Sequence, residues 1–353
     1  MQTDDRQASA VDAVHQSDLR PGELVEVRSQ EEILATLDEN GTLDGLPFMP
    51  EMLQFAGRRL RVYKRAIKAC DTIGNTGMYR MERAVHLDGV RCDGQAHGGC
   101  QAGCLIYWKE AWLKPAQPDA SGNGHHPQMP SSDADTTTGS LPLASRCTVA
   151  TLHEATRSEA SDSGDAVFSC QATELPRAAP VHIRGFDVGQ YVRDVTSGNA
   201  RPLPMLRGLL VLLFNKLQWA NRRFLPGRPL IHGGASYPFI DGRVRGKTPK
   251  QVLDLQPGEL VEVKSKEEIF ETLDKTGANR GLRFDGEMLR YSGQRARVLR
   301  RVDHIIDEKT GRMLHLPGDC IILEGVICTA DYHQFCPRSI YPYWREIWLR
   351  RVP

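Results

Sequence analysis

Two long stretches of the chain share one order of apolar and polar residues. The segment PGELVEV at positions 21–27 recurs at 257–263, and its apolar residues alternate with polar ones as in a half-buried strand. Residues 20–113 align with residues 256–349 without a gap at a constant offset of 236, and about 38 of the 94 aligned positions are identical. The chain therefore contains one module twice, and we call these two ranges the first and the second copy.

A short helix is expected after this strand in each copy. Ser29 with Glu32, and Ser265 with Glu268, have the Ser-x-x-Glu spacing of a capping box. In such a box each of the two residues satisfies a free backbone donor of the other. The segments EEILATLD and EEIFETLD are therefore predicted to begin helices.

The rest of each copy is predicted to consist of short strands. A basic strand covers residues 58–65 and 294–301, and Asp88-Gly89 and Glu324-Gly325 are predicted to be two-residue hairpin turns, because glycine accepts a positive φ. An aromatic strand, YWKEAWL or YWREIWL, closes each copy. About five strands with one short helix favour a small barrel. The predicted fold class is mainly β with some α: two tandem SH3-like barrel modules flank a mixed, partly helical middle region.

Each closing strand carries two tryptophans four residues apart, with a glutamate between them. The tryptophans are Trp108 and Trp112 in the first copy, and Trp344 and Trp348 in the second. We expect them in the barrel core, with an exposed stacking platform as the alternative. The glutamates, Glu110 and Glu346, are expected to pair with an arginine, with metal ligation as the alternative.

The segments outside the copies differ in character. Residues 1–19 are predicted to be a flexible tail, and residues 114–146, which are rich in Pro, Ser, Gly, Asp and Thr, a disordered linker. Residues 147–250 form a mixed α/β middle region that resembles neither copy and is expected to dock onto one or both barrels. Its apolar run from Leu209 to Phe214 is shorter than the ~20 residues that span a bilayer. We expect a buried helix there, with a helix on a membrane surface as the alternative.

Charge and cysteine content narrow the classes of function. The chain has 45 basic and 44 acidic residues, so no overall field attracts nucleic acid. The first twenty residues lack the charged start and apolar core of a secretory signal. We therefore expect a cytoplasmic location, in which the nine cysteines stay reduced. Metal ligation or catalysis is then a more common use of cysteine than a disulfide framework.

Cysteine and histidine occur at one spacing in both copies. The first copy contains Cys92-DGQA-His97-GG-Cys100, and the second contains Cys328-TADY-His333-QF-Cys336. The three donor positions are kept, although nearly all residues between them differ. Thiolate and imidazole groups this close in sequence can converge on one ion, for which zinc is the expected metal and iron the alternative. Burial of the cysteines as small core residues is the competing interpretation.

A closed tetrahedral zinc site needs a fourth ligand. Cys104 and Cys70 are the candidates in the first copy, whereas the second copy has isoleucine at both equivalent positions. Further candidates for the second copy are Cys320 and His304, although the predicted hairpin turns Cys320 to the other face of the sheet. In the middle region, additional candidates that would complete a site across a domain boundary are Cys147, Cys170 and His153.

The segment Cys92-Asp93-Gly94 followed by His97 resembles a fragment of the CDGSH-type iron–sulfur motif. In this chain the histidine follows Cys92 after four residues instead of three, and the Cys-x-Cys pair expected upstream is missing. The resemblance covers about six residues and implies an iron–sulfur cluster as an alternative cofactor.

Four functions are compatible with these residues. The leading hypothesis is a metal-binding protein whose paired modules bind an unknown protein or small molecule. The alternatives are a metalloenzyme with an open metal site in the second copy, an iron–sulfur redox protein, and barrels that bind nucleic acid through the basic strand and the aromatic residues. The sequence contains no Gly-x-Ser-x-Gly elbow, phosphate-binding loop or His-Glu-x-x-His pair, so no catalytic residue is assigned.

Overall fold

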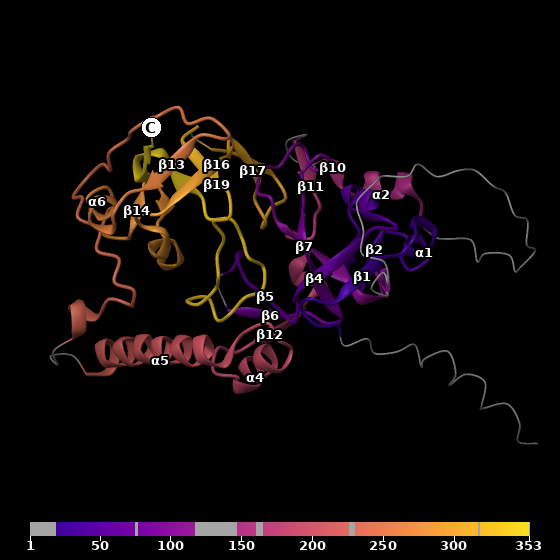
Figure 1. Ribbon diagram of the computed structural model, residues 1–353, viewed down its shortest axis with the longest axis horizontal. Helices are drawn as coiled ribbons and strands as arrows, with labels where there is room; N and C mark the ends of the chain where they lie inside the picture. The colour runs from indigo at the N-terminus through magenta and orange to yellow at the C-terminus, as the bar shows by residue number, and fades with distance from the viewer. Residues whose placement is uncertain are drawn as a thin grey trace, which may run out of the picture.

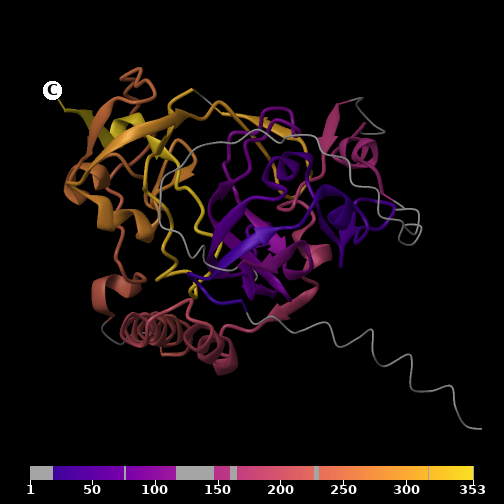
Figure 2. The same cartoon turned by 45° about the vertical axis from the view of Figure 1, so that its right-hand side comes forward.

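The computed structural model describes residues 19–74, 77–116, 147–159, 165–225, 230–316 and 318–352. The protein is mainly β with some helix, and its antiparallel sheets are curled. Two five-stranded sheets lie side by side, one in each copy, and helices α4 (Val188–Thr196) and α5 (Pro202–Phe224) run beneath them (Figure 1, Figure 2). The predicted tail and most of the predicted linker lie outside the described residues.

The two large sheets have the same order of strands, β8-β7-β4-β1-β9 in the first copy and β20-β19-β16-β13-β21 in the second. The first sheet consists of β1 (Leu24–Val27), β4 (Arg59–Arg65), β7 (Ala84–Arg91), β8 (Leu105–Lys109) and β9 (Leu113–Pro115). The second sheet consists of β13 (Leu260–Val263), β16 (Arg295–Arg301), β19 (Cys320–Leu323), β20 (Trp344–Arg345) and β21 (Leu349–Arg351). Strands β1, β4, β7 and β9 begin 236 residues before β13, β16, β19 and β21.

Short elements connect these strands. They are α1 (Gln30–Leu34), β2 (Thr42–Leu43), β3 (Leu46–Pro47), η1 (Pro50–Phe55) and η2 (Glu110–Trp112) in the first copy, and α6 (Lys266–Phe270), β14 (Ala278–Asn279), β15 (Leu282–Arg283), η4 (Gly286–Tyr291) and η5 (Glu346–Trp348) in the second. Both predicted capping boxes are confirmed. The N–H of Glu32 donates to Oγ of Ser29 at 3.2 Å, and the N–H of Ser29 donates to Oε2 of Glu32 at 2.9 Å. Ser265 and Glu268 make the same pair of bonds.

The predicted hairpin turn at Asp88-Gly89 is wrong. Strand β7 continues through both residues, and its pairing with β8 shifts register between His86 and Arg91. The positive φ of Gly89, 70°, therefore serves a bulge inside the strand. In the second copy β19 ends before Glu324-Gly325, and its partners are β16 and β20.

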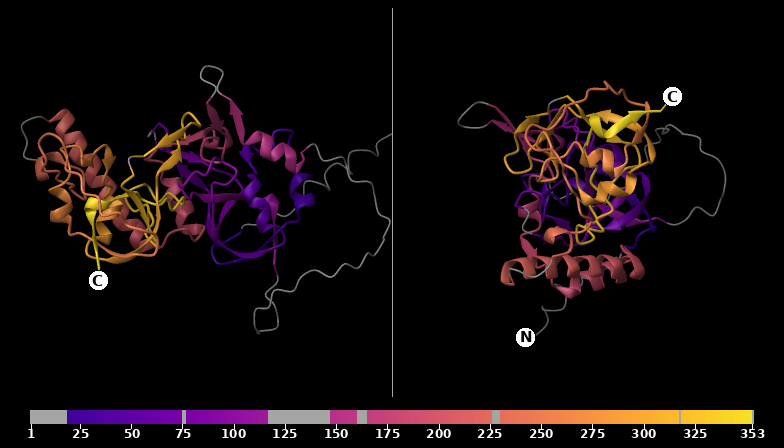
Figure 3. Two further views of the ribbon diagram at one scale, coloured as in Figure 1. Left: turned by 90° about the horizontal axis from the view of Figure 1, so that it is seen from above. Right: turned by 90° about the vertical axis from the view of Figure 1, so that its left-hand side faces the viewer.

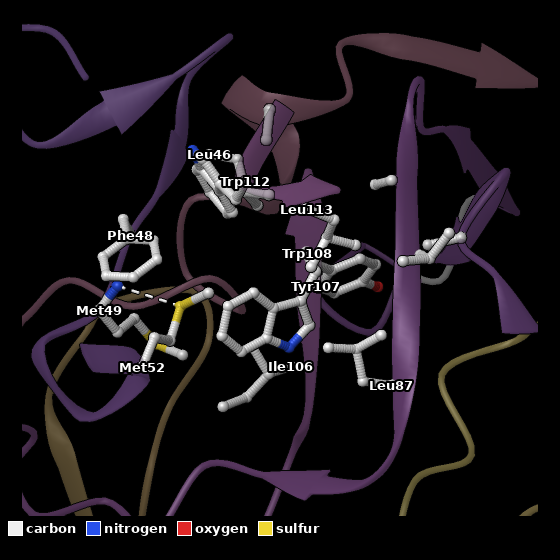
Figure 4. Packing of buried hydrophobic residues seen from close by; sticks show 14 of the residues in the cluster. Leu46, Phe48, Met49, Met52, Leu87, Ile106, Tyr107, Trp108, Trp112 and Leu113 are labelled. Carbon is white, nitrogen blue, oxygen red and sulfur yellow. Dashed lines mark hydrogen bonds between the residues drawn. The ribbon is translucent and has the colours of Figure 1, made fainter. Parts of the chain in front are cut away.

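The core of each sheet is built around the paired tryptophans, which are fully buried as expected. The ring of Phe48 meets Trp108 and Trp112 edge to face at centroid distances of 6.2 and 5.1 Å (Figure 4). Phe284 meets the equivalent pair of the second copy at 6.0 and 5.2 Å. The same aromatic cluster therefore anchors both sheets.

The glutamates between the tryptophans pair with arginines, as expected. Oε1 of Glu110 lies 3.5 Å from Nη2 of Arg65, and Oε1 of Glu346 lies 2.7 Å from Nη1 of Arg301. The two arginines also occupy equivalent positions, so the ion pair is common to both copies.

The middle region contributes strands to two small hairpins. It contains α2 (Val149–Ala155), β10 (Arg157–Glu159), β11 (Ala166–Phe168), α3 (Leu175–Ala178), β12 (Val181–Ile183), α4, α5 and η3 (Ile231–Gly234). Strand β12 pairs with β6 (Met78–Arg80), which pairs with β5 (Lys68–Cys70) of the first copy. Strand β11 contacts β18 (Met313–His315), which pairs with β17 (His304–Ile306) of the second copy.

Each of these hairpins reaches the cysteine and histidine loop of the other copy (Figure 1). The backbone N–H of Cys70 in β5 donates to Sγ of Cys336 at 3.2 Å. The backbone N–H of Ile306 in β17 donates to Sγ of Cys100 at 3.4 Å. Residues 70 and 306 are equivalent, as are residues 100 and 336, so one contact occurs twice with the copies exchanged.

Helix α5 includes the apolar run at 209–214, but the expectation that this run is buried is wrong for its outer side. Leu210 and Leu213 are 58% and 55% exposed. The inner side packs on the second copy so closely that a Cβ at Gly208 would lie 2.3 Å from the ring of Phe335. Among the described helices, none is long and apolar enough to cross a membrane.

A buried ion pair fixes the first hairpin to α4. Nζ of Lys68 lies 2.5 Å from Oδ2 of Asp194, and both side chains are fully buried. Burial raises the pKa of Asp194 to about 6 and lowers the pKa of Lys68, and their mutual attraction offsets part of both shifts. Removal of either partner would therefore leave the other side chain buried without its counter-ion.

We expect Asp194→Leu to lower the free energy of unfolding by about 3–5 kcal/mol, because it leaves the Lys68 ammonium buried without a counter-ion. The double variant Lys68→Met/Asp194→Leu should recover most of this loss, because apolar side chains of similar volume avoid the cost of desolvation. Urea unfolding of the three proteins measures both effects. A double variant as unstable as the single one would contradict this explanation.

A second buried polar residue, His86, is confined to the neutral form. Its Nδ1 lies 2.9 Å from the carbonyl O of Ile106, and the side chain is fully buried. Burial lowers the pKa of His86 to about 3, from 6.5 in an exposed chain. As the pH falls below 6.5 the unfolded chain binds a proton that the folded protein excludes, so this stability is complete above pH 6.5 and is lost toward pH 3.

Replacement of His86 by Ile, the residue at the equivalent position 322, should remove this part of the pH dependence. Between about pH 7.5 and about pH 4, wild type should lose about 3 kcal/mol more stability than His86→Ile. Urea unfolding at the two pH values measures the difference. Equal losses in the two proteins would show that His86 is protonated in the fold.

Candidate metal centre

Three potential ligands of the first copy meet beside its sheet. Glu51 lies in η1, Cys92 directly follows β7, and His97 lies in the next loop. Sγ of Cys92 donates to Oε1 of Glu51 at 3.0 Å, and Nδ1 of His97 lies 3.0 Å from the same oxygen. The three ligand atoms all lie within 4.8 Å of one another. Glu51 and His97 are buried, at 8% and 1% exposure.

Two potential ligand atoms of this group lack a hydrogen-bond partner among the described residues. Nε2 of His97 lies 3.1 Å from the carbonyl O of Ser169, which can only accept, so Nε2 carries a proton. Nδ1 lies 3.0 Å from Oε1 of Glu51, but this contact lacks the geometry of a hydrogen bond. Among the described residues, neither this Nδ1 nor Oε2 of Glu51 has a hydrogen-bond partner.

The carboxyl of Glu51 is ionised at neutral pH. Burial raises its pKa, but the neighbouring His97 and Cys92 outweigh burial and hold the pKa below its ordinary value. For Cys92, burial and the negative Glu51 raise the pKa of the thiol far above its ordinary value. Only a cation at this position would favour the thiolate.

A cavity of about 40 Å³ adjoins the group, which is room for a single ion or a water molecule or two. Besides His97, four cysteines line it: Cys92, Cys100 and Cys104 from the first copy and Cys170 from the middle region. Burial raises the pKa of Cys104 to about 12 and that of Cys170 to about 11. The structure thus places a thiol of the middle region beside the cluster of the first copy.

The second copy arranges its equivalent residues differently. Both oxygens of Glu287, the counterpart of Glu51, accept hydrogen bonds, from the N–H of Tyr332 at 2.7 Å and from Oγ1 of Thr329 at 2.8 Å. Nε2 of His333 lies 3.0 Å from Oδ1 of Asp285, and this contact raises the pKa of His333. Within the described residues, a compact group of three ligand atoms forms in the first copy only.

Cys70, a candidate ligand for the first copy, lies against the cluster of the second copy instead. A pocket of about 290 Å³ is lined by Cys70, Cys328, His333, Cys336 and Arg338. Burial would raise the pKa of Cys336, but the hydrogen bond from the Cys70 thiol and the positive charge of Arg338 lower it to about 7. The thiolate of Cys336, the form in which cysteine binds metals, is therefore more populated near neutral pH than in an ordinary cysteine.

The other candidate ligands lie apart from both groups. Cys320 is buried in the second sheet, where its Sγ accepts from Nη1 of Arg345 at 3.3 Å. His304 lies beside the first copy's loop, and its carbonyl O accepts from the N–H of Gln101. Cys147 is part of the first copy's core, and His153 is exposed on α2.

Glu51 was missed by the sequence analysis as a ligand. The signal for it is that Glu51 and Glu287 stand at equivalent positions in the shared segment Glu-Met-Leu. A carboxylate retained among apolar residues indicates either a buried hydrogen-bond acceptor or a metal ligand. In the second copy Glu287 is a buried hydrogen-bond acceptor. In the first copy Glu51 is a candidate metal ligand.

Comparisons with protein-family models, with curated proteins and with solved structures found no match to this chain. Its chemistry is therefore inferred from its own side chains. A groove of about 1330 Å³ between α5 and the second copy is larger than the two cavities described above, but no cysteine or histidine lines it. Within the part of the chain that the structure describes, the compact group of potential metal ligands is the one at the first copy's loop.

Proposed function

We propose that this chain is a metal-binding protein of two tandem SH3-like barrel modules, in which Glu51, Cys92 and His97 hold a zinc ion. The 94-residue repeat at an offset of 236 and the shared strand order of the two sheets support a duplicated barrel. The paired modules would present a surface to a protein or small-molecule partner.

The contact between Glu51 and His97 carries the proposal. Oε1 of Glu51 lies 3.0 Å from both Nδ1 of His97 and Sγ of Cys92, and the side chains of Glu51 and His97 are buried. Donor atoms this close together can reach a single ion. Nδ1 of His97 and Oε2 of Glu51 have no hydrogen-bond partner among the described residues, and a metal ion would employ both side chains together with Cys92.

Zinc suits this donor set. It accepts carboxylate oxygen, imidazole nitrogen and thiolate sulfur, and it prefers four ligands in a tetrahedron. The fourth ligand would be one of the thiols on the adjoining cavity: Cys100, Cys104 or Cys170. The cavity volume of about 40 Å³ favours a single ion over an iron–sulfur cluster.

The second hydrogen-bonding atom of His97 supports a structural role. Nε2 bonds to the backbone of Ser169, which fixes the ring and directs Nδ1 at the site. A metal ion there would connect η1, the loop after β7 and the middle region. A site that is closed by protein on all sides stabilises the fold and leaves no position for a substrate.

A metalloenzyme is the second candidate, and the pocket of the second copy is the observation that favours it. Catalytic metal sites keep one coordination position open to substrate. The pocket of about 290 Å³ beside Cys336 provides such space, unlike the small cavity of the first copy.

Glu51→Gln, Cys92→Ser and His97→Ala should each remove one zinc ion per chain. Each should also lower the free energy of unfolding by more than about 3 kcal/mol, because metal-binding free energy contributes to folding. Protein purified without a metal-affinity tag should be colourless, and elemental analysis with urea unfolding measures both effects. The matched control His153→Ala alters an exposed histidine and should change neither value.

Brown absorbance in the purified protein would favour iron–sulfur chemistry over zinc. A wild-type protein that folds without any metal and takes up none from solution would contradict the proposal. Retention of the full zinc content in both Cys92→Ser and His97→Ala would exclude this group as the site.

A further inference from the structure

The second copy lacks two donors that the first copy has. Cys104 is replaced by Ile340, and Glu287 already accepts a hydrogen bond at each oxygen. One donor is added from outside, because β5 of the first copy places Cys70 against Cys336. In the equivalent contact of the first copy's loop the residue is Ile306, which offers no donor.

The position of Cys70 is fixed from several sides. Its hairpin pairs with β12, and the buried ion pair of Lys68 with Asp194 holds the same strand. Arg338, which is 4% exposed, donates to the carbonyl O of Cys70 at 3.3 Å and to Oγ1 of Thr72 at 2.9 Å. Strand pairing and the bonds from Arg338 therefore hold the Cys70 thiol in a fixed position in the pocket.

Three sulfur atoms share this pocket. Cys70 and Cys328 both pack against a small cluster that contains Cys336, and all three line the cavity of about 290 Å³. Their sulfur atoms do not all lie within 4.8 Å of one another, so an ion would have to draw them together. The backbone N–H of Cys70 donates to the sulfur of Cys336, a contact that stabilises a thiolate ligand. Arg338, which also pairs with Oε1 of Glu308 at 3.0 Å, lies beside the sulfur atoms and favours their ionised form.

We propose that Cys70, Cys328 and Cys336 hold a second, thiophilic metal ion at the junction between the two copies. Sulfur donors select zinc or another soft to borderline ion over magnesium or calcium. The fourth position would face the pocket, where His333 or an external ligand would fill it. This inference rests on the proposed function in one respect: it assumes that the loop after β7 and its counterpart in the second copy both bind metal ions.

The test counts Zn²⁺ per chain in purified protein reconstituted with Zn²⁺ alone. Wild type should bind two ions, and Cys70→Ile should bind one, because isoleucine is the residue that the first copy's loop contacts at this position. Cys92→Ser should bind one, and Cys70→Ile/Cys92→Ser should bind none. Cys147→Ser is the matched control, a buried cysteine away from both sites that should leave two ions.

Other results separate the two proposals. A single ion that is lost in Cys92→Ser but kept in Cys70→Ile overturns the second centre and supports the first. The reverse pattern supports the second centre and overturns the first, and two ions in Cys70→Ile overturn the role of Cys70. If Cys70→Ile fails to fold, Cys328→Ser replaces it, with the same expected count and the same contradicting result.

Helix α5 carries an independent inference. Leu206, Leu210, Leu213 and Leu217 follow the spacing of one helix face, and each is between 55% and 59% exposed. Leu206 and Leu210 also lie at the edge of the groove between α5 and the second copy. Gly208 and Met205 on the opposite side pack toward the body of the protein. Figure 3 shows α5 as a rod along the base of the molecule, beyond the sheets.

The charge of α5 indicates what would cover this face. The helix contains Arg207, Lys216, Arg222 and Arg223 and no acidic residue. Phe224, which continues the leucine face at the end of the helix, is 67% exposed. Exposed leucines flanked by basic residues are typical of helices that lie in the surface of anionic membranes.

We infer that α5 docks on an anionic lipid surface through these leucines. Wild type should sediment with vesicles of phosphatidylcholine and phosphatidylglycerol and much less with phosphatidylcholine alone. Leu206→Gln/Leu210→Gln/Leu213→Gln should weaken binding at least ~10-fold, because three apolar side chains no longer enter the lipid. Val252→Gln/Leu314→Gln is the control, since both residues are exposed elsewhere.

No sedimentation of wild type, or binding unchanged in the triple variant, would overturn the lipid inference. Light scattering gives a further readout. A dimer that the triple variant loses, without any binding of vesicles by wild type, would show that a second copy of the chain covers this face instead.

Discussion

The contact between each β-hairpin and the opposite cysteine loop is the constraint on which the rest of the structure depends. A backbone N–H in one copy donates to a cysteine sulfur in the other, at Cys70 to Cys336 and at Ile306 to Cys100. Each cysteine and histidine loop therefore contacts a hairpin of the other copy. The two sheets are therefore held at the junction where the candidate metal chemistry lies, and strands β11 and β12 support the two hairpins that form it.

The two copies diverge in electrostatics while keeping this geometry. In the first copy the buried carboxylate of Glu51 faces an imidazole nitrogen and a thiol, and no backbone donor neutralises its second oxygen within the described residues. In the second copy each oxygen of Glu287 accepts a hydrogen bond, and Nη2 of Arg290 lies 3.6 Å from Oε2, so this buried carboxylate already has its partners. Cys336 instead has a pKa of about 7 because of Cys70 and Arg338. The two equivalent loops thus differ: one carries a closed polar group and the other an open thiol pocket.

Local features were predictable from the sequence because their causes are local. The capping boxes, the burial of the tryptophans and the pairing of Glu110 and Glu346 with arginines each depend on spacing within one copy. The turn predicted at Asp88-Gly89 failed because a positive φ fits a bulge as well as a hairpin, and the choice depends on a distant partner strand. The placement of Cys70 beside the second copy could not be predicted from the sequence for the same reason. It follows from how the two halves of the chain pack together. Periodicity likewise predicts that α5 is apolar but not which of its sides is covered.

The middle region explains why the two copies are separated in sequence by more than a linker. Ser169 orients His97 and Cys170 lines the same cavity, so the segment before β12 completes the first site. Asp194, farther along, neutralises Lys68 in the strand that carries Cys70, so α4 supports the second. A linker of the same length without these residues would supply neither the carbonyl acceptor for His97 nor the buried carboxylate for Lys68. The middle region therefore contacts both candidate sites, and a substitution in it would affect two clusters of side chains that lie on different copies.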